Sequence, residues 1–307
     1  MLSVTHEELV ASIHSLTCLK TIWKEAIVPT KTPQDQYTEV GQINTRFWAL
    51  GDEGGKVVLI HGIGDSVEAW TLNINTLAEH NRVYAMDLVG SGHSDKPSVP
   101  YSFSYLAQFV NDFMEAQSID QACLIGNSLG GGVALQFAIQ FPDKVEKLVL
   151  VASIGLGKEV NLLFRLPTLP LIGEWLTRPS RKGTAQVLKE CVYDPALVTT
   201  ELVEFYYQLD TLPGTQKSFL SMLRAGCNLL GLRDDVVRPI LDNLATITAP
   251  TLIVWGQQDR IVPVTHAHMA EKRIPNARLH IFDPCGHLPQ LERAEEFNTL
   301  VLEFLAS

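Results

Sequence analysis

The sequence predicts an α/β fold, with a mostly parallel sheet of the eight-stranded type, helices on both faces, and a helical cap inserted after the sixth strand. Three observations lead to this prediction. Strand-like and helix-like segments alternate through the first half of the chain, which is typical of a parallel sheet covered by helices. The alternation then stops over roughly residues 157–243, where the pattern is helical throughout. Strands resume at Pro250.

The expected strands before the insertion are apolar runs between turn residues, near 37–50, 57–61, 81–86, 120–126 and 145–153. The expected helices between them lie near 66–79, 103–118 and 129–141. After the insertion, two further strands are expected at 250–256 and 278–282, and a last helix follows them. The predicted organisation is therefore a core of residues 31–157 and 244–307 and a cap of residues 158–243.

Residues 1–30 precede the sheet and predict an amphipathic helix of about 20 residues. Its apolar residues recur at near-helical spacing: Leu9, Ile13, Leu16, Trp23 and Ile27. Packing against the body of the same chain is the favoured interpretation. Formation of a homodimer and contact with a membrane surface are the alternatives, although the helix lacks the basic face that anionic lipid favours.

Composition excludes several classes of protein. Apolar residues make up 46% of the 307 residues and charged residues 19%, which is typical of a globular protein with a large core. A net charge of −10 argues against nucleic acid, whose phosphates would repel the chain. The five cysteines have no paired spacing, which favours reduced thiols and a cytoplasmic setting. We expect no signal peptide and no transmembrane segment.

The most informative motif is Gly126-Asn127-Ser128-Leu129-Gly130, which separates an apolar strand from an apolar helix. A Gly-x-Ser-x-Gly turn in that context is typical of a nucleophile elbow, which holds a serine hydroxyl above the top of a sheet. The flanking glycines give the clearance that the closely passing strand and helix require. Ser128 is therefore the predicted nucleophile.

A serine nucleophile needs a general base and an acid that orients the base, and in elbow-bearing enzymes these follow in the order Ser, Asp or Glu, His. Asp259 comes just after the strand at 250–256, and His287 lies on the loop before the last helix. Asp283 is the rival to Asp259, because it is closer to His287 in sequence. Position in the sequence alone does not decide between them.

The turn His61-Gly-Ile-Gly-Asp65 follows a buried strand and predicts an oxyanion hole. The expected donors are the backbone N–H groups of Ile63 and Leu129, the latter being the residue after the nucleophile. His61 is expected to brace this turn. We expect no metal site, since His266 and His268 are two residues apart and do not share a helix face. No cofactor is expected either.

Together these motifs resemble the α/β-hydrolase superfamily, in its capped, haloalkane-dehalogenase-like and esterase-like branch. The resemblance covers roughly residues 37–307 and rests on five motifs in the family order: the oxyanion turn with Trp70, the segment 87–97, the elbow at Ser128, Asp259, and Gly286-His287. Asp259 matches the position of the acid in this family, so the resemblance implies that Asp259, and not Asp283, is the preferred acid. Dehalogenases and most epoxide hydrolases of this fold carry Asp at the elbow. Ser128 therefore disfavours both of these chemistries.

Asn127 departs from the His that ester hydrolases of this class often have before the serine, and we take it as a candidate substrate-binding residue. Asn-Ser resembles the meta-cleavage product hydrolases, which break a carbon–carbon bond in vinylogous diketone acids, and the pheophytinase branch, which hydrolyses a phytyl ester. The first family usually has Trp directly after the catalytic His, where Leu288 stands here. It also needs a cap arginine for the substrate carboxylate. The candidates are Arg165, Arg178, Arg181 and Arg224.

The predicted cap holds ten basic and ten acidic residues, so the core carries the whole net charge. Its first part, residues 162–176, is rich in leucine, and two prolines prevent one continuous helix. If part of this run lines the cleft, the pocket is apolar, and Trp175 is a candidate contact for the substrate.

We therefore expect a serine hydrolase that cleaves a carboxylic ester with an apolar acyl or alcohol part. Carbon–carbon hydrolysis of the meta-cleavage type is the main alternative, and lactone, amide or thioester cleavage is a further one. A slow-turnover ligand receptor that keeps the hydrolase pocket is the alternative of another class. The expected partner is a small apolar molecule.

Overall fold

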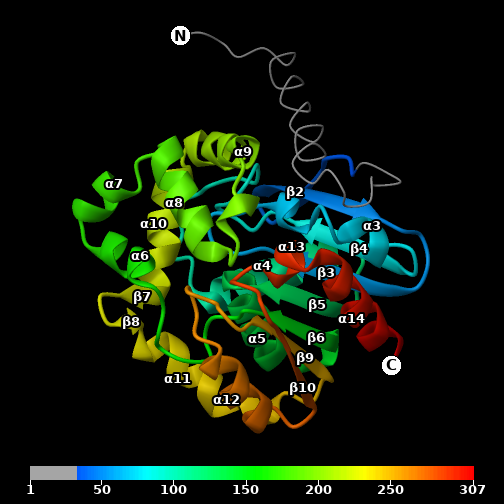
Figure 1. The fold of residues 1–307 in the computed structure, drawn as a ribbon. Helices are drawn as coiled ribbons and strands as arrows, with labels where there is room; N and C mark the ends of the chain where they lie inside the picture. Colours follow the sequence, from blue (N-terminus) through cyan, green and yellow to red (C-terminus); the bar gives the residue numbers. More distant parts are fainter. Residues whose placement is uncertain (1–32) are drawn as a thin grey trace.

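The computed structural model describes residues 33–307, so the helix predicted within residues 1–30 lies outside the described part of the chain. An eight-stranded sheet forms the centre of the described chain, in the order β1-β2-β4-β3-β5-β6-β9-β10 (Figure 1). β2 is antiparallel to β1 and to β4, and the strands from β4 to β10 are parallel. The strands are β1 (Gln36–Val40), β2 (Ile43–Leu50), β3 (Gly55–Ile60), β4 (Asn81–Met86), β5 (Ala122–Asn127), β6 (Val145–Val151), β9 (Thr251–Gly256) and β10 (Ala277–Phe282).

Side chains on both faces of the sheet are buried, which explains the continuous apolar runs of the parallel strands. In β3, Val57 and Leu59 belong to one core cluster, and Val58 and Ile60 belong to the other. The first cluster is covered by η1 (Val67–Trp70), α3 (Ile74–Leu77) and α14 (Ala294–Ala306). The second is covered by α4 (Phe103–Ala116), α5 (Leu129–Gln140), α11 (Asp234–Asn243) and α12 (Thr265–Arg273). The predicted fold class is confirmed.

The segment predicted as one strand near 37–50 is a hairpin. Gly41, at a φ of 63°, turns the chain between β1 and β2. Glycine adopts this left-handed conformation readily. In the sequence, the only signal of the turn was the glycine that interrupts the strand pattern. β1 lies at the edge of the sheet.

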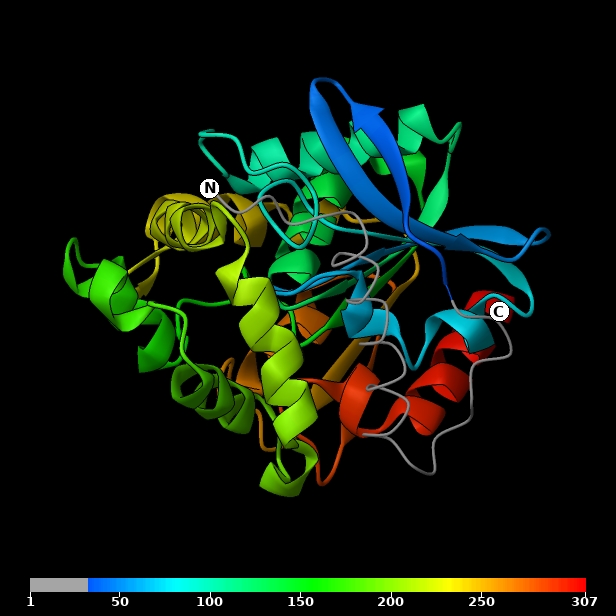
Figure 2. The ribbon, with the colours of Figure 1, turned by 90° about the horizontal axis from the view of Figure 1, so that it is seen from above.

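The insertion between β6 and β9 covers one end of the sheet, as seen from above in Figure 2. Its helices are α6 (Leu162–Arg165), η3 (Leu166–Thr168), α7 (Ile172–Leu176), α8 (Arg181–Cys191), η4 (Pro195–Leu197), α9 (Thr200–Thr211), α10 (Thr215–Gly226), α11 and η5 (Leu244–Thr246).

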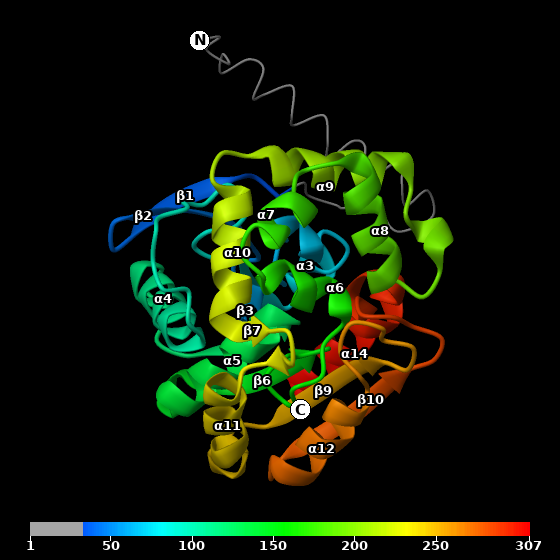
Figure 3. The same cartoon turned by 90° about the vertical axis from the view of Figure 1, so that its left-hand side faces the viewer.

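Two features differ from a purely helical cap. A short hairpin, β7 (Cys227–Asn228) and β8 (Gly231–Leu232), follows α10 and faces the viewer in Figure 3. α11 lies within the predicted cap range of 158–243, yet its Ile240 is buried in the core cluster with α5. Val237 of the same helix is buried in a cluster with Leu223 of α10 and Cys227 of β7, so α11 packs against both the core and the cap.

Within residues 33–307, none of the helices combines the length and the apolar character that crossing a membrane requires. The four cysteines of this part of the chain carry free thiols.

Candidate active site

Ser128 stands at the junction of β5 and α5 in a conformation that ordinary residues avoid. Its φ is 53° and its ψ is −112°. Such strain persists only where the surroundings enforce it, and it is characteristic of a nucleophile elbow. The Ser128 N–H donates to the carbonyl of Val151 at 2.9 Å, and the Ser128 carbonyl accepts from the N–H groups of Gly132 and Ile154, both at 3.1 Å.

The two glycines of the motif are required by close contact between backbones. A Cβ at Gly126 would lie 2.2 Å from the carbonyl oxygen of Gly130. A Cβ at Gly130 would lie 2.1 Å from the carbonyl oxygen of Ile60, at the end of β3. The clearance expected from the sequence motif is therefore present at both positions.

Asp259 and His287 form a buried pair beyond the ends of β9 and β10. His287 Nδ1 lies 2.8 Å from Asp259 Oδ2, and the Asp259 side chain is fully buried. Asp259 Oδ1 accepts the backbone N–H groups of Ile261 and Val262, at 2.8 and 2.9 Å. Because an ionised carboxylate can only accept, Nδ1 carries the imidazole proton and Nε2 keeps a free lone pair.

Asp283 is not placed to orient the histidine. It is exposed, and its carboxylate accepts a hydrogen bond of 2.7 Å from Nε2 of Gln258. Asp283, the carboxylate closer in sequence, thus contacts Gln258, while Asp259 contacts His287.

Asn127 links the two halves of the site. Its Nδ2 donates to the carbonyl of Val151 at 3.2 Å and to the carbonyl of His287 at 3.4 Å. The side chain is buried and does not line the cavity above Ser128. Within the described residues no hydrogen bond joins Ser128 to His287, and catalytic contacts of this kind often tighten only with substrate bound. The structure therefore places Asn127 beneath the site, where it fixes the histidine loop.

The backbone N–H groups of Ile63 and Leu129 are both available at the cavity. Leu129 is the first residue of α5, so its amide has no preceding helical carbonyl to bond. In the described part of the chain the Ile63 amide donates no hydrogen bond either, and both residues line the cavity with Ser128. Two backbone donors without a backbone partner among the described residues therefore lie at the cavity that Ser128 also lines.

His61 holds the turn that carries Ile63. Its Nδ1 lies 2.7 Å from the Gly62 carbonyl, and its Nε2 accepts the N–H of Leu88 at 3.0 Å. Burial lowers the pKa of His61, so the imidazole is neutral and can donate at one nitrogen and accept at the other. The expected bracing role fits this arrangement.

A buried ionic cluster lies behind the turn, and the sequence reasoning did not foresee it. Arg46 of β2 contacts Glu68 at 2.5 Å and Asp87 at 3.5 Å. Burial alone would lower the pKa of Arg46, but Glu68 and Asp87 raise it above its ordinary value. Asp87 also accepts the N–H groups of Val67 and His93, both at 2.7 Å. An arginine within the apolar strand 43–50 was the available signal, since a buried charge needs partners.

Asp65 connects the oxyanion turn to the cap. Its Oδ1 accepts the Ser66 N–H at 2.8 Å and the hydroxyl of Tyr206, on α9, at 3.1 Å. Burial raises the pKa of Asp65 to about 7. This contact joins core and cap, and sequence alone gave no indication of it.

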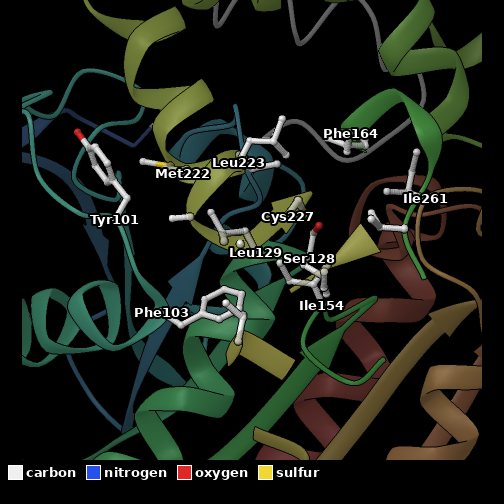
Figure 4. A pocket seen from close by; sticks show the side chains of 16 residues that line it. Tyr101, Phe103, Ser128, Leu129, Ile154, Phe164, Met222, Leu223, Cys227 and Ile261 are labelled. Carbon is white, nitrogen blue, oxygen red and sulfur yellow. The ribbon is translucent and has the colours of Figure 1, made fainter. Parts of the chain in front are cut away.

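The cavity above Ser128 is apolar and is shared between core and cap (Figure 4). Phe103 and Ile154 come from the core, while Phe164 of α6 and Met222 of α10 come from the cap. No charged side chain lines this cavity among the described residues. Tyr101 is one of its few polar side chains, and its hydroxyl donates to the Pro97 carbonyl at 2.6 Å.

The structure does not bring Trp175 to this cavity. Trp175 lies on α7, its side chain is 67% exposed, and it is absent from the cavity lining. The leucine-rich run suggested an inward face, but only Phe164 of residues 162–176 reaches the cavity.

Metal chemistry has no ready site in the described residues, where no three His, Cys, Asp or Glu side chains form a possible metal-binding group. His266, for which no metal-binding role is expected, contacts Glu159 at 2.9 Å.

Comparison with known proteins places this geometry in a family. A family model described as the alpha/beta hydrolase family matches residues 57–300. The chain is 34% identical over 276 residues to a 2-hydroxy-6-oxo-2,4-heptadienoate hydrolase of Pseudomonas putida, which covers 87% of this chain and 94% of that protein.

Two solved structures are similar over most of their length. A meta-cleavage product hydrolase from Pseudomonas fluorescens has a TM-score of 0.76 at 31% identity, covering 88% of this chain and 97% of that one. A proposed lipase from Acinetobacter baumannii has a TM-score of 0.78 at 25% identity, covering 100% of this chain and 97% of that one. The match to the family model, which spans most of the chain, shows that this protein belongs to the α/β-hydrolase family.

Proposed function

We propose that this protein is a serine hydrolase that cleaves carboxylic esters with an apolar acyl or alcohol part. The observation that carries the proposal is the environment of Ser128. This serine lies on a strained elbow, and no charged side chain is found among the described residues that line its cavity. An apolar cavity with a few convergent polar groups suits a neutral, hydrophobic substrate.

In the proposed mechanism, Ser128 Oγ attacks the ester carbonyl while Nε2 of His287 accepts the serine proton. Asp259 holds the imidazole in the tautomer with Nδ1 protonated and stabilises the imidazolium that forms. His287 then protonates the alcohol, which leaves. A water molecule, deprotonated by His287, attacks the acyl-enzyme and releases the acid.

The amides of Ile63 and Leu129 would bind the oxygen that becomes negative in each tetrahedral intermediate. One such donor typically contributes about 2.7–4 kcal/mol to transition-state stabilisation. His61 would contribute indirectly, because its two hydrogen bonds fix the turn that presents the Ile63 amide.

Carbon–carbon hydrolysis is the second candidate, and the similarity to the 2-hydroxy-6-oxo-2,4-heptadienoate hydrolase favours it. Such a substrate carries a carboxylate, which requires a cation in the binding site. None of the four cap arginines lines the cavity above Ser128. Arg181 is paired with Glu204 and Arg224 with Glu174, while Arg178 is exposed. Arg165 is half-buried, and its Nε has no hydrogen-bond partner in the described part of the chain. The ester interpretation is therefore better supported by the geometry.

The discriminating experiment measures kcat/KM for p-nitrophenyl esters of increasing acyl length and for a 2-hydroxy-6-oxo-dienoate. We expect turnover of medium-chain esters and little or none of the dienoate. Single changes of Arg165, Arg178, Arg181 and Arg224 to Gln should alter ester kcat/KM only a few-fold. A bound carboxylate that lost its arginine would instead lose roughly 10- to 150-fold in affinity.

A kcat/KM for the dienoate far above that for every ester, with one arginine essential, would establish the second candidate in place of the first. Absence of both a burst and turnover on every substrate would favour a ligand receptor. Because the proposed chemistry uses only side chains and backbone amides, a chelator should leave ester turnover unchanged.

A further inference from the structure

The outer face of the cap exposes an unusual amount of apolar side chain. α6, η3, α7 and the β7–β8 hairpin lie side by side on this face (Figures 1 and 3). We call it the cap patch, and its exposed apolar residues are Leu162, Leu163, Leu166, Leu171, Ile172, Trp175, Leu176, Leu229 and Leu230. Nine of the twelve large apolar residues that are exposed in the described chain belong to it. A concentration of this kind marks an interaction surface.

Leu171 shows that the exposure is maintained at a cost. Its side chain is 83% exposed, and its φ of 65° is a left-handed conformation that a leucine rarely adopts. Glycine would satisfy this backbone better and would remove the apolar group from water. Leu171 is thus unfavourable both for its backbone conformation and for its exposure to water. Such a residue is expected where a function requires it.

The charge of the cap patch indicates what it binds. Residues 162–182 contain four basic residues and one acidic residue, a net charge of +3 in a chain of net charge −10. Arg178 and Lys182 are exposed and have no ion-pair partner among the described residues. Exposed leucines with a tryptophan and nearby cations suit the boundary of an anionic lipid layer, where Trp is favoured and basic residues attract the headgroups.

The cap patch is also continuous with the cavity above Ser128. Phe164 lines that cavity, while its neighbours on α6, Leu162 and Leu163, are exposed. Cys227 lines the same cavity and also a hollow on the outer surface, which is bordered by Leu229 and Leu230. The α6 and β7–β8 segments therefore border both the cap patch and the cavity above Ser128.

We propose that the cap patch docks this protein on an anionic lipid surface, from which an apolar ester enters the cavity above Ser128. The proposed docking is inferred from the cap patch alone. The entry of the ester rests on the proposed function, so docking is measured without turnover and the two can fail separately.

The test is co-sedimentation of the full chain with vesicles of phosphatidylcholine containing about a quarter phosphatidylglycerol. We expect binding that falls with added salt. L171N should lower the affinity about tenfold, because an inserted leucine side chain is lost. Its melting temperature should stay close to that of the parent, because the Leu171 side chain is 83% exposed. Tyr37→Ser, at an exposed position of β1 outside the cap patch, is the matched control and should bind like the parent.

Fluorescence locates the contact. Trp48, Trp70 and Trp255 are fully buried, so Trp175 is the exposed tryptophan of residues 33–307. Vesicles should shift the emission to shorter wavelength, and Trp175→Phe should abolish the shift. A shift that survives this substitution would come from another tryptophan and would overturn the cap patch as the site of contact. Changing Arg178 and Lys182 to Gln should weaken binding to the anionic vesicles roughly fivefold per residue.

Vesicle binding that is the same in L171N and the parent would overturn the proposal, and so would the absence of binding. Light scattering that shows a dimer in the parent and a monomer in L171N, without vesicle binding, would make the cap patch an interface between two copies instead. Vesicle binding lost in L171N, with no ester cleaved, would leave the docking established and refute the proposed function.

Discussion

Replacing Asp259 by Asn tests the proposed catalytic apparatus most directly. Asp259 Oδ1 accepts two backbone N–H groups, from Ile261 and Val262, and Oδ2 faces Nδ1 of His287. An asparagine has one carbonyl oxygen and one NH₂ group. Its oxygen is expected to face the two backbone N–H groups, because an NH₂ group placed there would set one donor against two others. The NH₂ group therefore faces His287.

This orientation determines the loss of rate. Nδ1 of His287 must then accept a hydrogen bond, so the imidazole proton moves to Nε2, where the lone pair is needed to receive the Ser128 proton. Serine hydrolases with this defect lose about 10⁴-fold in kcat, or about 5 kcal/mol of transition-state stabilisation. We expect Asp259→Asn to behave in this way, with its melting temperature changed only slightly because the residue shape is preserved.

The assay is steady-state hydrolysis of a p-nitrophenyl ester, with a pre-steady-state burst to follow acylation. Asp283→Asn is the matched control, because Asp283 is exposed and contacts Gln258, and it should lose no more than a few-fold. If Asp259→Asn keeps a tenth or more of the parent kcat, or if Asp283→Asn is the more damaged variant, the acid has been placed wrongly.

Three further outcomes follow from the structure. Ser128→Ala should lower kcat by several orders of magnitude without unfolding the protein, and near-normal turnover would exclude this serine as the nucleophile. Asp65 has a pKa raised from 3.8 to about 7 by burial, so its stabilisation is full below pH 3.8 and is lost as the pH rises through 7. Asp65→Asn should therefore gain stability relative to the parent between pH 5 and 8, on the order of 2–4 kcal/mol, in urea unfolding; a difference independent of pH would contradict this. Gly130→Ala should destabilise the fold by about 3 kcal/mol or more, or prevent folding, because the new Cβ meets the Ile60 carbonyl. Gly226→Ala is the control and should be tolerated, because its Cβ would have only one neighbouring atom, at 4.0 Å.

The sequence predicted the sheet and the chain order of the candidate triad because both depend on local patterns. Apolar runs fix strands, and the Gly-x-Ser-x-Gly turn can form only where strand and helix backbones nearly touch. The choice between Asp259 and Asp283 needed the family resemblance, and the structure now shows which carboxylate contacts His287.

The sequence could not predict features that depend on the direction in which a side chain points across a tertiary contact. Trp175 was expected at the substrate and lies on the outer surface, because a leucine-rich stretch broken by prolines has no regular period from which to assign an inner face. Asn127 was expected to contact the substrate and instead bonds the His287 carbonyl. The Tyr206 contact to Asp65 joins residues 141 positions apart and has no local signature.

The strand order has a consequence for the growing polypeptide. β3, β5 and β6 are central and are made early, whereas β9 and β10 add to one edge of the sheet and are made last. A nascent chain that has reached the end of the cap would already hold the elbow serine and both oxyanion amides, but neither the imidazole nor its carboxylate partner. During synthesis the proposed nucleophile would thus stay inert until β9 and β10 join the sheet.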